Sequence, residues 1–254
     1  MRVYQCEDSL EGIFTAIYNT YEDKSDRNDT IISPSQELYL FAEYIPVETD
    51  VQKAVKVINT LRRRFGEGDY MSICMALASS DTEKAQCVYR TIASGLEKNT
   101  SQGHLFDNLA DNHVNKAFSL ARGANNEYLH LRGFIRFAEL EQGILYSKIG
   151  PKNNVLTFLM PHFADRFPME NFILYDERRE LFGIHPAGKE WFLVKETGEE
   201  FKEESLKHSD REREYQQLFR YFCKKIAIES RENSDLQRNM LPLRFREYMT
   251  EFNG

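Results

Sequence analysis

The feature that most constrains the fold is a change in apolar spacing about halfway along the chain. In the first half, apolar residues recur at helical intervals, as in the run from Leu10 to Tyr21 that follows the potential helix cap Ser9. In the second half, short apolar runs are separated by turn residues, which is typical of strands. The spacing therefore predicts an α+β protein. It should have a helical N-terminal half, a mostly antiparallel sheet in the second half, and C-terminal helices packed on that sheet.

The individual elements follow from the same patterns. Strands are predicted at residues 2–5, 37–45, 128–138, 143–149, 172–176, 181–185 and 191–195. A helix over residues 105–122 is expected to end at Gly123, since glycine favours the position after a helix C-terminus. Asn153 or Asn154 should cap a short helix, and Pro161 should open the next one. We expect one domain, residues 1–254, with an internal boundary near 123–127 between a mainly helical part, 1–122, and a sheet-containing part, 128–254.

Charge does not exclude nucleic acid as a partner, although the formal net charge is −7. Residues 1–60 carry 5 Lys or Arg against 11 Asp or Glu, whereas residues 211–246 carry 9 against 5. A chain with its charge separated in this way can repel a polyanion at one surface and bind it at another.

The absence of several sequence motifs argues against some classes of function. The four cysteines are scattered without a CxxC pair or a histidine at ligand spacing, so we expect no metal site and no cofactor bound by this chain alone. No apolar run is long enough to span a membrane and the N-terminus lacks the apolar stretch of a signal peptide, so we expect a cytoplasmic protein without membrane contact. Motifs for nucleotide binding, serine hydrolysis or zinc hydrolysis are absent.

The predicted strand at 128–138 carries the first candidate site. Alternation would place Arg132, Phe134 and Arg136 on one face, where an aromatic ring between two guanidinium groups could stack a base and hold phosphates. In the alternative structural interpretation, Phe134 packs under a neighbouring helix and each arginine pairs with a glutamate at position 139 or 141.

Two further clusters combine acid, base and cationic groups. His162 and Arg166 are four residues apart and should share a helical face, where the histidine could act as an acid, a base or a phosphate ligand. Asp176 ends an apolar strand and precedes Arg178 and Arg179, so it is either a working carboxylate or a residue that stabilises a turn.

A cationic stripe near the C-terminus is the last candidate. It consists of residues spaced 7, 4 and 7 apart, opposite an apolar helical face: Arg213, Arg220, Lys224 and Arg231. This stripe is either a phosphate-binding surface or the solvated side of an amphipathic helix.

Five ordered segments carry a family resemblance. They are residues 9–18 (SLEGIFTAIY), 133–137 (GFIRF), 161–167 (PHFADRF), 173–179 (ILYDERR), and a tail that includes 215–219 (YQQLF), 228–233 (IESREN) and Pro242. With them the chain resembles a bacterial family of DNA-metabolism and DNA-repair proteins built around a domain of unknown function. The resemblance implies a radical-SAM protein as a partner. Longer members carry a C-terminal uracil-DNA-glycosylase domain, which we expect to be absent here.

Three functional hypotheses follow. In the first, the protein is a DNA-binding repair factor whose arginines hold phosphates while a radical-SAM partner supplies redox chemistry on a base. In the second, it is an enzyme acting on a nucleobase or nucleotide, with His162 and Asp176 as the acid/base pair. In the third, it is a non-catalytic adaptor whose basic face binds an acidic protein.

Overall fold

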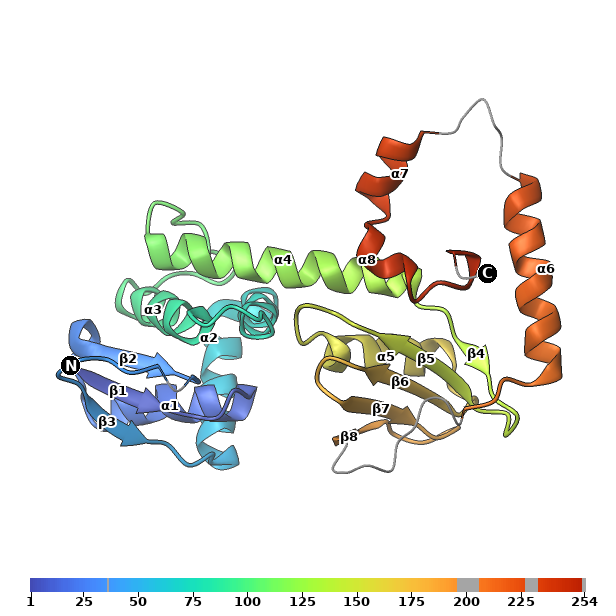
Figure 1. Ribbon diagram of the computed structural model, residues 1–254. Coiled ribbons are helices and arrows are strands. Elements are labelled where there is room, and N and C mark those ends of the chain that lie inside the picture. The colour runs from blue at the N-terminus through green and yellow to red at the C-terminus, as the bar shows by residue number, and fades with distance from the viewer. Residues whose placement is uncertain (36, 196–205, 227–232, 253–254) are drawn as a thin grey trace. The chain divides into compact units, whose positions relative to one another are not determined.

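The computed structural model describes residues 1–35, 37–195, 206–226 and 233–252. The chain forms two compact units, Met1–Asn125 and Asn126–Gly254. Each unit has its own sheet (Figure 1).

A small parallel sheet organises the first unit. Its strands are β1 (Arg2–Gln5), β2 (Thr30–Ser33) and β3 (Glu43–Pro46), in the order β2-β1-β3. The central strand β1 pairs in parallel with both neighbours, and its residues Val3 and Tyr4 are fully buried. The prediction of a strand at 2–5 is confirmed, the strand expected over 37–45 is confined to its C-terminal end, and β2 was not predicted. A single turn of 3-10 helix, η1 (Arg27–Asp29), precedes β2.

The first unit also contains three complete helices, which are α1 (Leu10–Glu22), α2 (Val51–Leu77) and α3 (Lys84–Glu97). Ser9 caps α1 by accepting a hydrogen bond from the Gly12 amide, as its sequence position predicts. The Asp50 carboxylate caps α2 by accepting from two backbone amides at 2.8 and 3.1 Å. A cap of this kind contributes about 1 kcal/mol to helix stability.

The predicted helix end at Gly123 and the predicted strand at 128–138 are both wrong. One helix, α4 (Asn112–Phe134), runs through the whole segment. Its fully buried residues recur at helical spacing on both sides of Gly123, at Ala117, Ala121, Ala124 and Leu131. The side chains of Leu131 and Ile135 suggested strand alternation, but they are also four residues apart. Gly123 faces open space, so the helix bears only the backbone-entropy cost of a glycine, about 1 kcal/mol.

The second unit contains a five-stranded sheet in the order β4-β5-β6-β7-β8. The strands are β4 (Ala138–Glu139), β5 (Leu145–Ile149), β6 (Phe172–Asp176), β7 (Leu181–His185) and β8 (Phe192–Lys195). The β5–β6 pair is parallel because the chain crosses between these strands through a helix, α5 (Leu156–Arg166), while the other three pairs are antiparallel. The mostly antiparallel sheet and the α+β class are thus confirmed.

Helix α5 differs in detail from its prediction. It is one helix with Pro161 in its interior, and no side chain caps its N-terminus. Asn153 does not cap it, because its amide group donates to Glu127. The buried residues Leu159 and Phe163 on α5 join Leu131 and Ile135 of the α4 segment in one apolar core.

The C-terminal segment contains α6 (Asp210–Ile226), α7 (Ser234–Met240), α8 (Leu243–Arg246) and a final 3-10 turn, η4 (Thr250–Phe252). Phe245 on α8 is buried in the same core as α5, and Met249 is buried nearby in sequence. Helix α6 has no buried residue, and its predicted inward face is largely exposed, at Tyr215, Leu218, Phe219, Phe222 and Ile226. Packing of the C-terminal segment on the core is therefore provided by α8.

Candidate functional site

Three of the predicted site residues come together where α4 and α5 pack in the second unit. Arg132 lies in the last turn of α4, and His162 and Arg166 lie one turn apart on α5. Leu131 and Phe163, their neighbours in sequence, belong to the same buried core. The packing explains why cationic groups 30 or more positions apart in the sequence act on one another.

Burial and nearby charges together determine the electrostatics of this cluster. Burial lowers the pKa of His162, and the charges of Arg132 and Arg166 lower it further, while Asp165 opposes the shift. Both arginines are exposed, and within the described residues neither forms an ion pair. Each lies over an aromatic ring of its own helix region, Arg132 over Tyr128 at 5.4 Å and Arg166 over Phe167 at 5.6 Å. We refer to Arg132, His162 and Arg166 as the cationic cluster.

The proposed strand face with Arg132, Phe134 and Arg136 does not exist, since these residues lie at the end of a helix and just beyond it. The ring of Phe134 packs against His130 and Phe245, with centroids 5.6 and 5.4 Å away. Arg136 forms a salt bridge of 2.8 Å with Glu251, whose side chain is only 14% exposed. Arg136 also donates to two backbone carbonyls. Phe134 and Arg136 thus have structural contacts close to those of the alternative interpretation, although the acidic partner is Glu251.

Asp176 lies at the centre of a buried ion pair, separate from the cationic cluster. It ends β6 with a side chain that is 0% exposed, accepts a 2.9 Å hydrogen bond from Arg179, and accepts another from the Arg178 amide at 3.1 Å. Arg179 in turn donates to the carbonyls of Pro151 and Lys152 at 3.1 and 2.7 Å. Burial raises the pKa of Asp176, and the Arg179 charge opposes this shift. The contacts match the turn-stabilising interpretation of this aspartate.

The remaining candidates are dispersed. Arg178 is exposed, and the contact that it makes to Asp176 comes from its backbone. Arg213 pairs with Asp210 at 3.2 Å and shares α6 with Arg220 and Lys224, whereas Arg231 lies outside the described residues. Among the described residues, His162 and Asp176 form no hydrogen bond or ion pair with each other. Their role as an acid/base pair stays a prediction.

Sequence reasoning missed Glu127. Its side chain is 1% exposed and forms a salt bridge of 3.2 Å with Arg244. It also accepts hydrogen bonds from the backbone amides of Lys152 and Asn153, at 3.0 and 2.8 Å, and from the Asn153 side chain at 2.8 Å. The carboxylate therefore makes two connections from α4, one to the loop before α5 and one to α8. Its position three residues after Ala124 and four before Leu131 places it on the buried face of α4, a signal that appears only once the helix is recognised.

The family model for a domain of unknown function, DUF4130, matches residues 82–251. The chain belongs to this family. The matched span contains the cationic cluster, Glu127 and the Asp176 site, together with the whole five-stranded sheet. No curated protein and no solved structure matches the chain.

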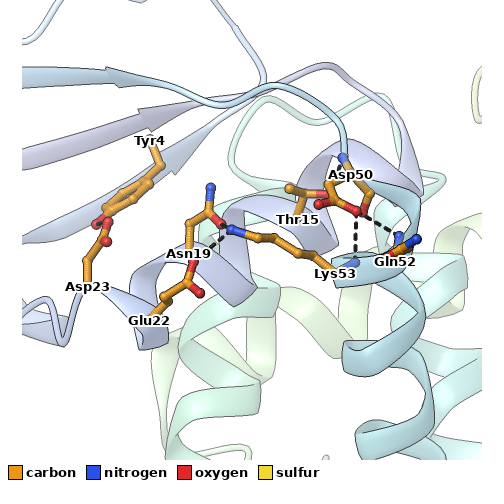
Figure 2. A network of polar contacts seen from close by, with 8 residues as sticks. All are labelled: Tyr4, Thr15, Asn19, Glu22, Asp23, Asp50, Gln52 and Lys53. Carbon is orange, nitrogen blue, oxygen red and sulfur yellow. Dashed lines mark hydrogen bonds and ion pairs between the residues drawn. The ribbon is translucent and has the colours of Figure 1, made fainter.

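Most of the first unit precedes the span matched by the DUF4130 family, and a network of polar contacts in this unit is shown in Figure 2. Lys53 on α2 donates to Asn19 and Glu22 on α1 at 2.8 and 2.7 Å (Figure 2). The Asp50 amide donates to the Thr15 hydroxyl at 3.1 Å, and that hydroxyl donates to Glu11 of the same helix. These contacts join α1 to the start of α2, and we assign them a structural role.

The residues that the structure describes lack both a metal-binding cluster and a helix suited to a membrane. They contain no cluster of three or more His, Cys, Asp or Glu side chains able to hold a metal ion. None of their helices combines the length and the apolar character that crossing a membrane requires.

Proposed function

We propose that this member of the DUF4130 family binds nucleic acid in DNA metabolism or repair, with the cationic cluster as its phosphate-binding centre. The proposal is carried by two exposed arginines that form no ion pair within the described residues and whose charges both act on one half-buried histidine. Guanidinium groups bind phosphate oxygens in pairs of parallel hydrogen bonds, and an arginine not already paired with a carboxylate is free to do so.

Other cationic residues extend the proposed interface. Arg178 is exposed near the end of β6, and α6 carries Arg213, Arg220 and Lys224. We assign these a secondary contribution, since Arg213 already has an acidic neighbour. Arg136 and Arg179 have a structural role in the proposal, because their guanidinium groups are held by Glu251 and Asp176.

The proposal includes a radical-SAM protein as the partner that performs redox chemistry on a base. Its support is the resemblance carried by the five sequence segments. In this scheme our chain binds and positions the strand, and Asp176 has a structural role beside Arg179.

The experiment that tests the proposal measures binding of single- and double-stranded oligonucleotides by the full chain across a salt series. The test variant is Arg132→Ala/Arg166→Ala. The matched control is Lys189→Ala/Lys207→Ala, which removes the same charge from two other exposed positions of the second unit. Each lost phosphate contact should reduce the slope of log affinity against log salt by roughly 0.7–0.9. We therefore expect a reduced slope in the arginine variant and a nearly unchanged slope in the lysine control.

The opposite results are equally informative. Equal losses in both double variants would mean that net charge, not the cationic cluster, governs binding. Absence of oligonucleotide binding at low salt would contradict the proposal and favour an adaptor, whose basic surface should then bind an acidic protein that oligonucleotides do not displace.

A further inference from the structure

Helix α6 turns polar side chains toward the rest of its unit and apolar side chains toward solvent. Glu212, in its first turn, accepts a 3.1 Å hydrogen bond from the Glu139 amide of β4. Tyr215 and Phe222 are each 53% exposed, and Phe219 is 37% exposed. An amphipathic helix normally buries its apolar face, so this inverted arrangement leaves a face that a partner can cover.

We infer that this face of α6 binds single-stranded nucleic acid, with the rings of Tyr215, Phe219 and Phe222 stacking against unpaired bases. These three residues are four and three positions apart and therefore share one side of the helix, which we call the aromatic face. This inference rests on the proposed function, because it specifies which form of nucleic acid the protein prefers.

The charge along α6 favours a polyanion as the occupant of the aromatic face. Residues 215–226 carry three cations and no acidic residue, since the acidic residues of the helix all precede Tyr215. Arg211 lies four residues before Tyr215, and Lys225 lies three residues after Phe222. Each end of the aromatic face therefore has a cation beside it that can hold a phosphate.

Two contacts on the helix already combine a cation with an aromatic ring. The Arg211 guanidinium lies 5.4 Å from the centre of the Tyr215 ring, and the Lys225 ammonium lies 5.5 Å from that of Tyr221. Tyr221 is itself 60% exposed. A base stacked on either ring would bring its phosphate within reach of the neighbouring cation, which is the combination that single-strand-binding surfaces use.

The spacing of the rings suits a single strand and not a duplex. With a helical rise of 1.5 Å per residue, the three rings follow one another along the axis at steps of roughly 6 and 4.5 Å. Bases in a duplex are about 3.4 Å apart and cover one another's faces, so an outside ring has no base face to stack on. An unpaired strand can separate its bases and place them on aromatic side chains. The aromatic face should therefore add affinity for single strands alone.

The test measures binding of three nucleic acids of equal length by the full chain. They are a single-stranded oligonucleotide, the same sequence as a duplex, and a strand of abasic sites that keeps only the sugar–phosphate backbone. The test variant is Tyr215→Leu/Phe222→Leu, which keeps apolar side chains and removes the rings. The matched control is Leu218→Ala, which removes apolar surface from the same helix without removing a ring. No residue of α6 is buried, so both variants should fold as the wild type does.

We expect the wild-type protein to bind the strand with bases about tenfold more tightly than the abasic strand, since one stacked base contributes an effect of this size. The leucine variant should lose this preference, and Leu218→Ala should retain it. Duplex affinity should be the same in all three proteins.

Two results would overturn the inference. The first is equal affinity of the wild-type protein for the strands with and without bases. The second is an equal loss of single-strand affinity in Leu218→Ala and in the leucine variant, which would assign the face to an apolar protein or a membrane. In both cases the proposed function survives if binding still depends on Arg132 and Arg166, whereas it fails if none of the three nucleic acids binds at low salt.

Discussion

Two pairs of arginines in the second unit have the same chemistry and opposite surroundings. Arg136 and Arg179 are held by Glu251 and Asp176, carboxylates that are 14% and 0% exposed. Arg132 and Arg166 are exposed and form no ion pair within the described residues. The comparison teaches that arginine content alone does not mark a binding surface. What matters is whether the fold already supplies each guanidinium with a carboxylate.

The largest effect is expected from Arg179→Ala, which leaves the fully buried Asp176 carboxylate without its cation. Breaking one partner of a buried pair costs about 3–5 kcal/mol, and the lower end applies here because Arg179 is partly exposed. Urea unfolding would measure this loss. A change below 1 kcal/mol would remove the distinction between the two arginine pairs.

The next effect is expected from Glu127→Ala, which removes the acceptor for the Lys152 and Asn153 amides. Unsatisfied buried donors cost about 1–3 kcal/mol, and the free energy of unfolding should fall by that amount. Oligonucleotide affinity should fall as well, because Glu127 fixes the loop that leads into α5 and hence the placement of His162 and Arg166 relative to Arg132. Glu127→Gln, which retains an acceptor, should recover part of both losses. A stability loss without any loss of affinity would disprove the positioning role.

A smaller effect is expected from Arg136→Ala. Arg136 contacts one carboxylate oxygen of Glu251, and the other oxygen is buried without a hydrogen-bond partner. Removal of the arginine should therefore destabilise the protein by about 1–2 kcal/mol. Thermal unfolding would detect this change. A melting temperature equal to that of the wild type would place Arg136 with the unpaired arginines.

The smallest effect concerns pH. The pKa of His162 is lowered in the folded protein, so the unfolded state binds more protons as the pH falls through the ordinary histidine range. The contribution of His162 to stability is therefore fully present above that range and is lost as the pH decreases. The variant His162→Gln should show a flatter dependence of unfolding free energy on pH between about 7 and 5. An unchanged dependence would mean that the pKa of His162 is not lowered in the folded protein.

Much of the fold could be predicted from local spacing. The strands β1, β6 and β7 and the cap Ser9 lie where the sequence predicts them, since short apolar runs and capping side chains act locally. The α4 segment could not be resolved in this way. Leu131 and Ile135 fit both a strand and a helix, and Gly123 suggested a helix end that tertiary packing overrides.

The candidate site was predicted only in part, for the same physical reason. The grouping of His162 with Arg166 follows from their spacing on one helix, but the addition of Arg132 depends on how α4 packs against α5. The acidic partner of Arg136 is 115 positions away in the sequence, so no local pattern indicates it. Ion pairs between residues far apart in the sequence decide which arginines lack a carboxylate partner. These pairs are visible only in the structure.

The most direct test of this account compares Arg132→Ala with Arg136→Ala, two identical changes four positions apart. Oligonucleotide affinity and melting temperature would be measured for both variants under the same low-salt conditions. The account predicts that Arg132→Ala lowers affinity and leaves the melting temperature unchanged, while Arg136→Ala lowers the melting temperature and leaves affinity unchanged. The reverse pattern, with affinity lost on removal of Arg136 and retained on removal of Arg132, would contradict it.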